Sequence, residues 1–209
     1  VLMEPLKETE LSIHQTAMVI GGGISGLTAA SSLAAQGYET HLIERNENLG
    51  GQAVNLFHTA QGDDIQQKLS EVISAVKANN NIKIHLNTEI SNVDGFVGNF
   101  KSTLTSDGKS EELEHGIAVL ATGASPYTPT EYAYGQDSKI MTTLELDKKL
   151  IADDPMINQL NSALFIQCVG SREPQRQYCS RVCCTHSIEN ALELKKRNPD
   201  MNVYIVYRD

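Results

Sequence analysis

Four cysteines carry the most distinctive chemistry of this chain, and all of them fall in one short segment. Cys168, Cys179, Cys183 and Cys184 form a C-x10-C-x3-C-C pattern. Four thiolates are the ligand set of a structural zinc ion or of a [4Fe-4S] cluster. Zinc sites usually show two C-x2-C pairs, so the adjacent pair here favours iron and sulfur. A disulfide framework would spread its cysteines along the chain, so the segment also indicates a reducing compartment.

Other interpretations of the cysteine segment stay open. Some of the thiols, Cys168 above all, would be unreactive if they were simply buried at the end of an apolar strand. A flavin-linked dithiol is another option, although its C-x-x-C spacing is absent. Loop arginines in this segment would offset the charge of four thiolates. The six histidines are scattered without a ligand spacing, and only His186, just past the cysteines, is placed to tune a cluster by hydrogen bonding.

A glycine-rich turn between an apolar strand and a helix is the second chemical signal. Gly21, Gly23 and Gly26 have the G-x-G-x-x-G spacing. The first glycine permits a tight turn, the second lets the backbone approach a pyrophosphate, and the third allows close packing of helix and strand. Ile24 and Ser25 start the helix, whose N-terminal N–H groups attract phosphate. A purely structural tight turn is the alternative.

Glu44 ends the strand that follows this helix. A carboxylate there can accept hydrogen bonds from both ribose hydroxyls, and its charge disfavours a 2′-phosphate. The strand, turn, helix, strand and acid occur in the order that a dinucleotide site requires. The sequence therefore predicts the adenosine of FAD or NAD.

The residues after Glu44, R-N-E-N-L-G-G-Q, resemble the flavoprotein family that has two dinucleotide-binding domains. In that family a Gly-Gly pair runs along the pyrophosphate and ribityl chain of the flavin, and a later A-T-G approaches the cofactor. The resemblance implies FAD as the cofactor. The contacts that it adds are Arg45, Gly50, Gly51, Gln52, Ile90, Ala121, Thr122 and Gly123.

Three further segments, F-I-Q-C-V-G-S-R, Y-C-S-R-V-C-C and V-Y-I-V-Y-R-D, resemble the A subunit of heterodisulfide reductase. This is a flavin and iron-sulfur protein of methanogens and other anaerobes. The resemblance implies electron transfer between FAD and iron-sulfur centres, with all four cysteines as ligands of a [4Fe-4S] cluster. It also implies iron-sulfur partner subunits in a redox complex.

The chain departs from that family by lacking the repeated C-x2-C-x2-C ferredoxin motifs and part of the FAD domain. We therefore expect a fragment that binds FAD weakly, can lose its cluster and does not catalyse the complete reaction alone. Two other functions stay open. One is a flavoenzyme of the pyridine-nucleotide-disulfide oxidoreductase type, reduced directly by NADH or NADPH. The other is a non-catalytic scaffold of a redox complex.

The elements that must position these residues predict an α/β protein with a Rossmann-like FAD-binding fold, a β meander and a truncated second βαβ domain. We expect a leader over 1–15, the FAD-binding domain over 16–138 and the second domain over 139–209. Asp107-Gly108 is typical of a tight hairpin turn. The expected strands are 17–20, 40–44, 82–86, 96–105, 112–114, 117–121, 163–168 and 203–207, and the expected helices are 25–36, 63–79 and 187–197.

Composition limits the classes of function. The chain has 209 residues, of which 40% are hydrophobic, and a formal net charge of −9. A phosphate backbone would be repelled by this charge, so nucleic acid is not an expected partner. The longest apolar run is too short to cross a bilayer, and residues 1–15 lack the pattern of a signal peptide. We expect a cytoplasmic protein.

Overall fold

The computed structural model describes residues 11–59 and 61–208. Their contacts divide the chain into two units. The first unit comprises the described residues up to 51 together with 70–123, and the second comprises 52–69 together with 124–208. The division thus falls after 123, whereas the sequence placed it at 138. Most of the expected leader, residues 1–10, lies outside the described residues.

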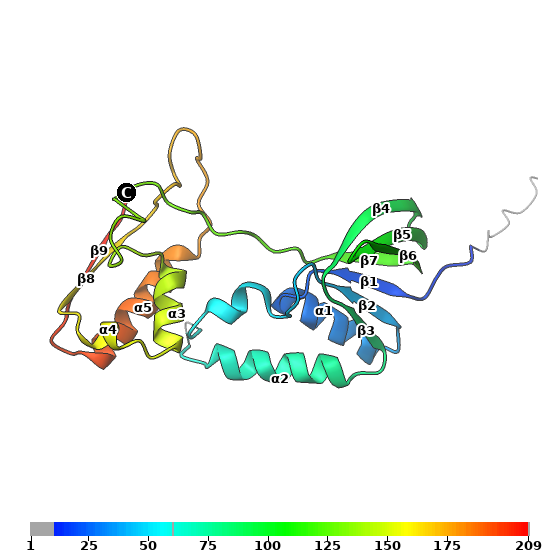
Figure 1. Cartoon of the computed structure of the whole chain (residues 1–209), viewed down its shortest axis with the longest axis horizontal. Helices are drawn as coiled ribbons and strands as arrows, with labels where there is room; N and C mark the ends of the chain where they lie inside the picture. Colours follow the sequence, from blue (N-terminus) through cyan, green and yellow to red (C-terminus); the bar gives the residue numbers. More distant parts are fainter. Residues whose placement is uncertain (1–10, 60, 209) are drawn as a thin grey trace, which may run out of the picture. The chain divides into compact units, whose positions relative to one another are not determined.

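The first unit is built on a four-stranded parallel sheet with the order β3-β2-β1-β7. Its strands are β1 (Ala17–Ile20), β2 (Thr40–Ile43), β3 (Ile82–His85) and β7 (Ile117–Leu120). Helix α1 (Ile24–Ala35) connects β1 to β2 and packs on both strands, and α2 (Ile65–Ala78) precedes β3 (Figure 1). This arrangement confirms the predicted Rossmann-like fold.

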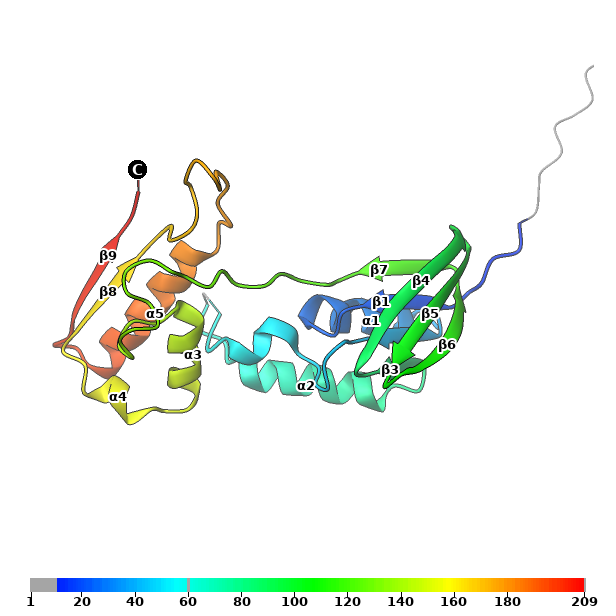
Figure 2. The ribbon, with the colours of Figure 1, turned by 45° about the horizontal axis from the view of Figure 1, so that its top comes forward.

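An antiparallel meander covers the other face of this sheet (Figure 2). Its strands are β4 (Thr88–Phe96), β5 (Asn99–Ser106) and β6 (Lys109–His115), in the order β4-β5-β6. Apolar side chains from the sheet and the meander, among them Met18, Ile43, Leu104 and Leu113, form a small core between the two layers. The tight turn predicted at Asp107-Gly108 joins β5 to β6, and both residues have positive φ, as a type I′ turn requires.

The prediction for the meander was wrong in one respect. The sequence placed a strand from 96 to 105, but residue 96 ends β4, and β5 starts only at 99. Strand β4 was missed because most of its side chains are exposed and its sequence T-E-I-S-N-V-D-G-F lacks a clear apolar alternation. Strand β6 is also longer than the three residues predicted for it.

The second unit contains a two-stranded parallel sheet of β8 (Ser162–Ile166) and β9 (Asn202–Val206). The two strands are connected through the cysteine segment and α5 (Cys183–Arg197), which confirms the predicted second βαβ outline. Helices α3 (Thr143–Ile151) and α4 (Pro155–Asn158) and a short 3-10 helix, η1 (Gly51–Asn55), complete the secondary structure described here. The core of this unit contains Leu146, Leu150, Ile157, Phe165, Ala191, Leu194 and Met201.

Two features of the second unit differ from expectation. Helix α5 begins at Cys183 instead of Ser187, so the adjacent cysteines belong to its first turn. Helix α3 was not predicted, although its capping box was visible in the sequence: Thr142 accepts from the backbone of Glu145, and the Glu145 carboxylate accepts from the backbone N–H of Thr142.

Candidate dinucleotide site and cysteine segment

Three glycine-containing segments that are far apart in the sequence meet in the first unit. A Cβ added to Gly21 would lie 2.3 Å from the carbonyl oxygen of Ala121, and one added to Gly51 would lie 2.9 Å from the Cα of Gly23. The N–H of Gly50 donates to the carbonyl of Gly22 at 2.8 Å. The glycine turn, the Gly-Gly pair and the A-T-G segment therefore form one cradle of bare backbone.

The cradle leads into α1, whose N-terminus faces it. Gly23 is the N-cap residue, and no side chain caps the helix. The first N–H groups of a helix have no intrahelical acceptor, and together with the helix dipole they bind phosphate. Gly26 has a packing role, since an added Cβ would lie only 1.8 Å from the carbonyl oxygen of Gly21. The residues thus fit a pyrophosphate at Gly23 and allow no side chain at Gly26.

Glu44 directs its carboxylate back toward the glycine turn. Oε2 accepts from the N–H of Gly22 at 2.7 Å, and Oε1 accepts from the backbone N–H and the Nδ2 of Asn46 at 2.9 and 2.7 Å. A carboxylate offers about four acceptor positions, so one remains, on Oε2. The buried carboxylate can therefore take one further donor, such as a ribose hydroxyl, instead of the two that the sequence predicted.

The remaining residues that were predicted to contact FAD differ in their surroundings. Gly123 has a φ of +67° and open space around its Cα. Ile90 packs its side chain against the core between sheet and meander, so only its backbone is available for a ligand. The Oε1 of Gln52 accepts from the Nδ2 of Asn55. Arg45 is exposed. The roles of these residues stay predictions.

Residues 15–157 match the family described as pyridine nucleotide-disulphide oxidoreductase. The chain belongs to this family. It is a family of flavin oxidoreductases with a Rossmann-like FAD/NAD(P)-binding fold, so the predicted fold class and the assignment as an oxidoreductase are confirmed.

The curated relatives of this chain include A subunits of heterodisulfide reductases. The chain is 27% identical to the A subunit of the H(2):CoB-CoM heterodisulfide,ferredoxin reductase of Methanothermobacter marburgensis, over all of this chain and 45% of the relative. It is 25% identical to the iron-sulfur A subunit of the CoB–CoM heterodisulfide reductase of Methanocaldococcus jannaschii, over 99% of this chain and 45% of the relative. The chain thus spans about half the length of these relatives. The resemblance predicted from the sequence is confirmed.

A solved structure shows a similar fold. The crystal structure of L-proline dehydrogenase from P. horikoshii matches 97% of this chain and 37% of its own, with a TM-score of 0.55 and 20% sequence identity.

The cysteine segment of this family member lies in the second unit, between β8 and α5. Cys168 is buried and has a φ of 60°, Cys179 and Cys184 are exposed, and Cys183 is intermediate. All four thiols are free. Partial burial, and then the charges of the other three cysteines, raise the pKa of the Cys184 thiol. Cys184 therefore lies within electrostatic range of the other three thiols.

The loop between Cys168 and Cys183 folds back on itself. The N–H of Arg172 and the Oγ of Ser171 both donate to the carbonyl of Tyr178, the latter at 2.7 Å. The N–H of Arg181 contacts the Sγ of Cys179 at 3.3 Å. Because of this fold-back, Tyr178 returns to the first part of the loop at Ser171 and Arg172.

Four cysteine thiols suit a metal cluster, but their sulfurs are not gathered into a ligand site in the structure as described. Among residues 11–59 and 61–208, no three His, Cys, Asp or Glu side chains are gathered closely enough to hold a metal ion. Ligation of a cluster by the four cysteines therefore stays a prediction, and its assembly would require the sulfurs to draw together.

Tyr127 holds one side of the cysteine loop. Its ring lies against Gly170, where an added Cβ would be 2.2 Å from the ring, and the guanidinium of Arg176 stacks over it at 4.6 Å. The Nη1 of Arg176 also donates to the carbonyl of Gly170 at 3.2 Å. Arg176 is thus a structural part of the loop.

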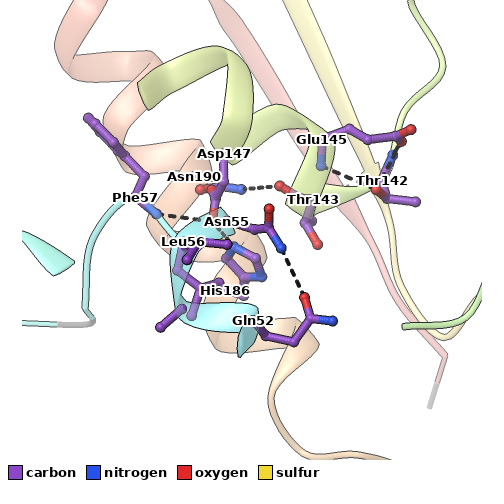
Figure 3. Close-up of polar contacts among 12 residues, drawn as sticks. Gln52, Asn55, Leu56, Phe57, Thr142, Thr143, Glu145, Asp147, His186 and Asn190 are labelled. Atoms are coloured by element: carbon purple, nitrogen blue, oxygen red, sulfur yellow. Dashed lines mark hydrogen bonds and ion pairs between the residues drawn. The ribbon is translucent and has the colours of Figure 1, made fainter. Parts of the chain in front are cut away.

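A buried acid at the centre of the second unit was not predicted from the sequence. Asp147 on α3 is 1% exposed, and its Oδ2 contacts the Nε2 of His186 at 2.7 Å and the N–H of Phe57 at 3.3 Å (Figure 3). The Asp147 carboxylate raises the pKa of His186 above its usual value. This pair joins the first turn of α5 to α3 and to the segment that follows η1. The expectation that His186 tunes a cluster is untested, whereas its contact with Asp147 is direct.

The described residues form no helix with the length and apolar character needed to cross a membrane.

Proposed function

We propose that this chain is the FAD-binding part of an electron-transfer oxidoreductase, of the same type as the A subunits of heterodisulfide reductases. The convergence of the glycine turn, the Gly-Gly pair and the A-T-G segment on one cradle supports FAD most strongly. Such a cradle of bare backbone, opening at an uncapped helix N-terminus, suits the pyrophosphate of a dinucleotide. The similarity to heterodisulfide reductase A subunits supports the type of oxidoreductase.

In this proposal, each part of the first unit has one task. The backbone of Gly21 to Gly26 binds the pyrophosphate, and the free acceptor position on Glu44 Oε2 binds a ribose hydroxyl. Gly50, Gly51 and the A-T-G segment admit the ribityl chain without a side chain in its path. When bound, FAD supplies the ability to take up an electron pair and to pass electrons on one at a time.

The cysteine segment forms the second part of the proposal. We assign Cys168, Cys179, Cys183 and Cys184 as ligands of a [4Fe-4S] cluster, because the four thiols are free and Cys184 lies within electrostatic range of the other three. The name of one relative, an iron-sulfur subunit, supports this assignment. Iron-sulfur partner subunits are proposed on the same ground. A cytoplasmic location is proposed because free thiols persist in a reducing compartment.

A flavoenzyme reduced directly by a nicotinamide nucleotide is the second candidate. The family match supports it, because the name of the family includes pyridine nucleotide. The turn after β8 reads V-G-S-R and lacks the glycine spacing of a second dinucleotide site. Electron exchange through protein partners is therefore the first choice.

The test begins with the full 209-residue chain, produced and purified under anaerobic conditions. We expect flavin bands in the absorbance spectrum and about four irons and four sulfides per chain, as a [4Fe-4S] cluster requires. Serine variants of the four cysteines should each lower the iron content, whereas Gln175→Ala, a change of an exposed side chain within the same loop, should leave it unchanged. Flavin without iron would overturn the cluster assignment. Absence of both would favour a scaffold.

Adding NADH or NADPH to the flavin-loaded chain separates the two candidates. No bleaching of the flavin band is expected if electrons arrive through partners. Complete bleaching with a pyridine nucleotide would support the second candidate instead.

A further inference from the structure

His41 and His85 lie side by side on two neighbouring strands of the parallel sheet. The Nδ1 of His41 is 2.9 Å from the Nε2 of His85. The ring centroids are 5.1 Å apart and the ring planes differ by 18°. The two rings therefore meet edge to edge and nearly coplanar, as in an N–H···N hydrogen bond. His41 is 7% exposed, so its ring is shielded from water.

A carboxylate contacts each outer end of this histidine pair. The Nε2 of His41 is 3.1 Å from Oε1 of Glu39, and the Nδ1 of His85 is 3.1 Å from Oε1 of Glu111. Four side chains thus form a row of three polar contacts. The row starts just before β2, crosses β3 and ends on β6 in the meander.

Complete hydrogen bonding along this row requires a definite number of protons. An ionised carboxylate only accepts hydrogen bonds, so each outer ring nitrogen must carry a proton. The contact between the rings needs one more proton, on one of the two inner nitrogens. Three protons on four ring nitrogens correspond to one imidazolium and one neutral imidazole. With two protons one contact would lose its hydrogen, and with four the inner nitrogens would repel each other.

The surroundings of His85 oppose the addition of a further proton to the pair. Burial, and next the charge of His41, lower the pKa of His85, while Glu111 acts in the opposite direction. A fourth proton on the ring nitrogens is therefore resisted once three are bound. The titratable groups that face the pair come from the residue before β2, from β3 and from β6, and they are Glu39, Lys83, Glu111 and His115.

The backbone of His85 connects this row to the dinucleotide site. The carbonyl of His85 accepts from the N–H of Glu44 at 2.8 Å, and the carbonyl of Glu44 accepts from the N–H of Thr88 at 3.0 Å. Glu44 in turn accepts from the N–H of Gly22 in the glycine turn. A cavity of about 530 Å³ is lined by His85 and Glu111, so protons can reach the pair from solvent.

We propose that His41 and His85 hold one shared proton, and that this proton site positions Glu44 for the adenosine ribose of the flavin. The positioning of the ribose rests on the proposed function, whereas the shared proton does not. His85 is then a positioning residue that acts through Glu44. Acidification adds a fourth proton to the ring nitrogens of the pair. Both inner nitrogens then carry a hydrogen and repel each other, and the ends of β2 and β3 separate at Glu44.

The direct test is an NMR titration of the flavin-free full chain, with isotope-labelled imidazole nitrogens and backbone amides, from about pH 9 to pH 5. We expect two separate protonation steps, both sensed by both rings, because coupled groups titrate as a pair. The amide signals of Gly22 and Glu44 should follow the lower step. Independent titration of the two rings would overturn the shared proton. Amides that ignore the lower step would overturn the positioning of Glu44.

Two carboxylates on β6 provide a matched pair of variants. Glu111→Gln removes the charge that faces His85, so the upper step should move to lower pH. Glu112→Gln changes the adjacent exposed carboxylate, which pairs with Lys101 instead, and should leave both steps unchanged. Equal effects of the two variants would show that only general surface charge matters, and would overturn the assignment.

A second measurement connects the site to the flavin. FAD affinity of the full chain should weaken about tenfold across the lower step, the effect of one hydrogen bond to a charged group. An unchanged affinity would overturn the role in flavin binding. If FAD binds at no pH, the proposed function fails, and the amide signals of Gly22 and Glu44 still decide whether the pair positions Glu44.

Discussion

Replacing Gly23 by alanine separates the role of the glycine turn in binding from its role in folding. Gly23 has φ −74° and ψ 179°, a conformation open to any residue, and the nearest atom to an added Cβ is the Cα of Gly51 at 3.9 Å. Loss of chain entropy in the unfolded state would stabilise the variant by about 0.4–1 kcal/mol. Alanine is a poorer N-cap than glycine by a similar amount. We therefore expect an unfolding free energy close to that of the parent.

The new methyl group would, however, stand where a pyrophosphate must approach the backbone. We expect FAD to bind at least about tenfold more weakly to G23A, which corresponds to about 1.4 kcal/mol. The assay is a titration of the flavin-free chain with FAD, followed by flavin fluorescence. Thermal unfolding of the same sample, recorded by circular dichroism, verifies that the fold is retained.

Gly26→Ala is the matched control. Its Cβ would lie 1.8 Å from the carbonyl oxygen of Gly21, which is backbone and cannot swing away. Overpacking of this kind costs about 3 kcal/mol or more, which lowers the melting temperature of a domain near 100 residues by about 10 °C or more. If G23A bound FAD as tightly as the parent, the pyrophosphate would not pass Gly23. If G26A melted at the parent temperature, the packing argument would be wrong.

Three further outcomes are expected. Glu44→Gln places an amide where only acceptors fit, so we expect a loss of about 1–3 kcal/mol in unfolding free energy, measured by urea denaturation, together with weaker FAD binding. Asp147→Asn removes the charge that faces His186, so unfolding of the second unit in urea should become easier by about 1–2 kcal/mol, and an unchanged midpoint would contradict the role of the pair. Burial lowers the pKa of His115, so below about pH 6.5 the unfolded chain binds more protons than the folded one. Stability should therefore fall between about pH 7 and pH 5 in thermal melts, and the fall should be smaller in His115→Gln.

Several features of the fold were predictable because their signals are local. The turn at Gly21 to Gly26 follows a short apolar strand and starts a helix, and each of these elements depends on residues next to it in the chain. The same holds for the hairpin at Asp107-Gly108, where both residues adopt positive φ. The order strand, helix, strand then leaves a parallel Rossmann-like sheet as the expected arrangement, because a parallel crossover needs a helix.

Strand β4 and the first turn of α5 were not predicted because their own residues give no clear signal of a strand or a helix. Most side chains of β4 are exposed, so hydrogen bonding to β5 instead of an apolar pattern holds it in place. Helix α5 starts at Cys183, in a stretch of cysteine, threonine and histidine that has little helix preference of its own. Packing of its later residues on the core of the second unit supports that first turn.

The sequence alone predicted which residues carry chemistry: the glycines of the turn, Glu44 and the four cysteines. The tertiary structure decided which of them meet. Gly51 reaches Gly23, and Ala121 reaches Gly21, because the sheet order β3-β2-β1-β7 brings the ends of distant strands to one edge. The pairing of His41 with His85 joins residues 44 positions apart. No periodicity along the chain encodes such contacts, because they arise only when hydrogen bonding fixes which strands are neighbours and in which register.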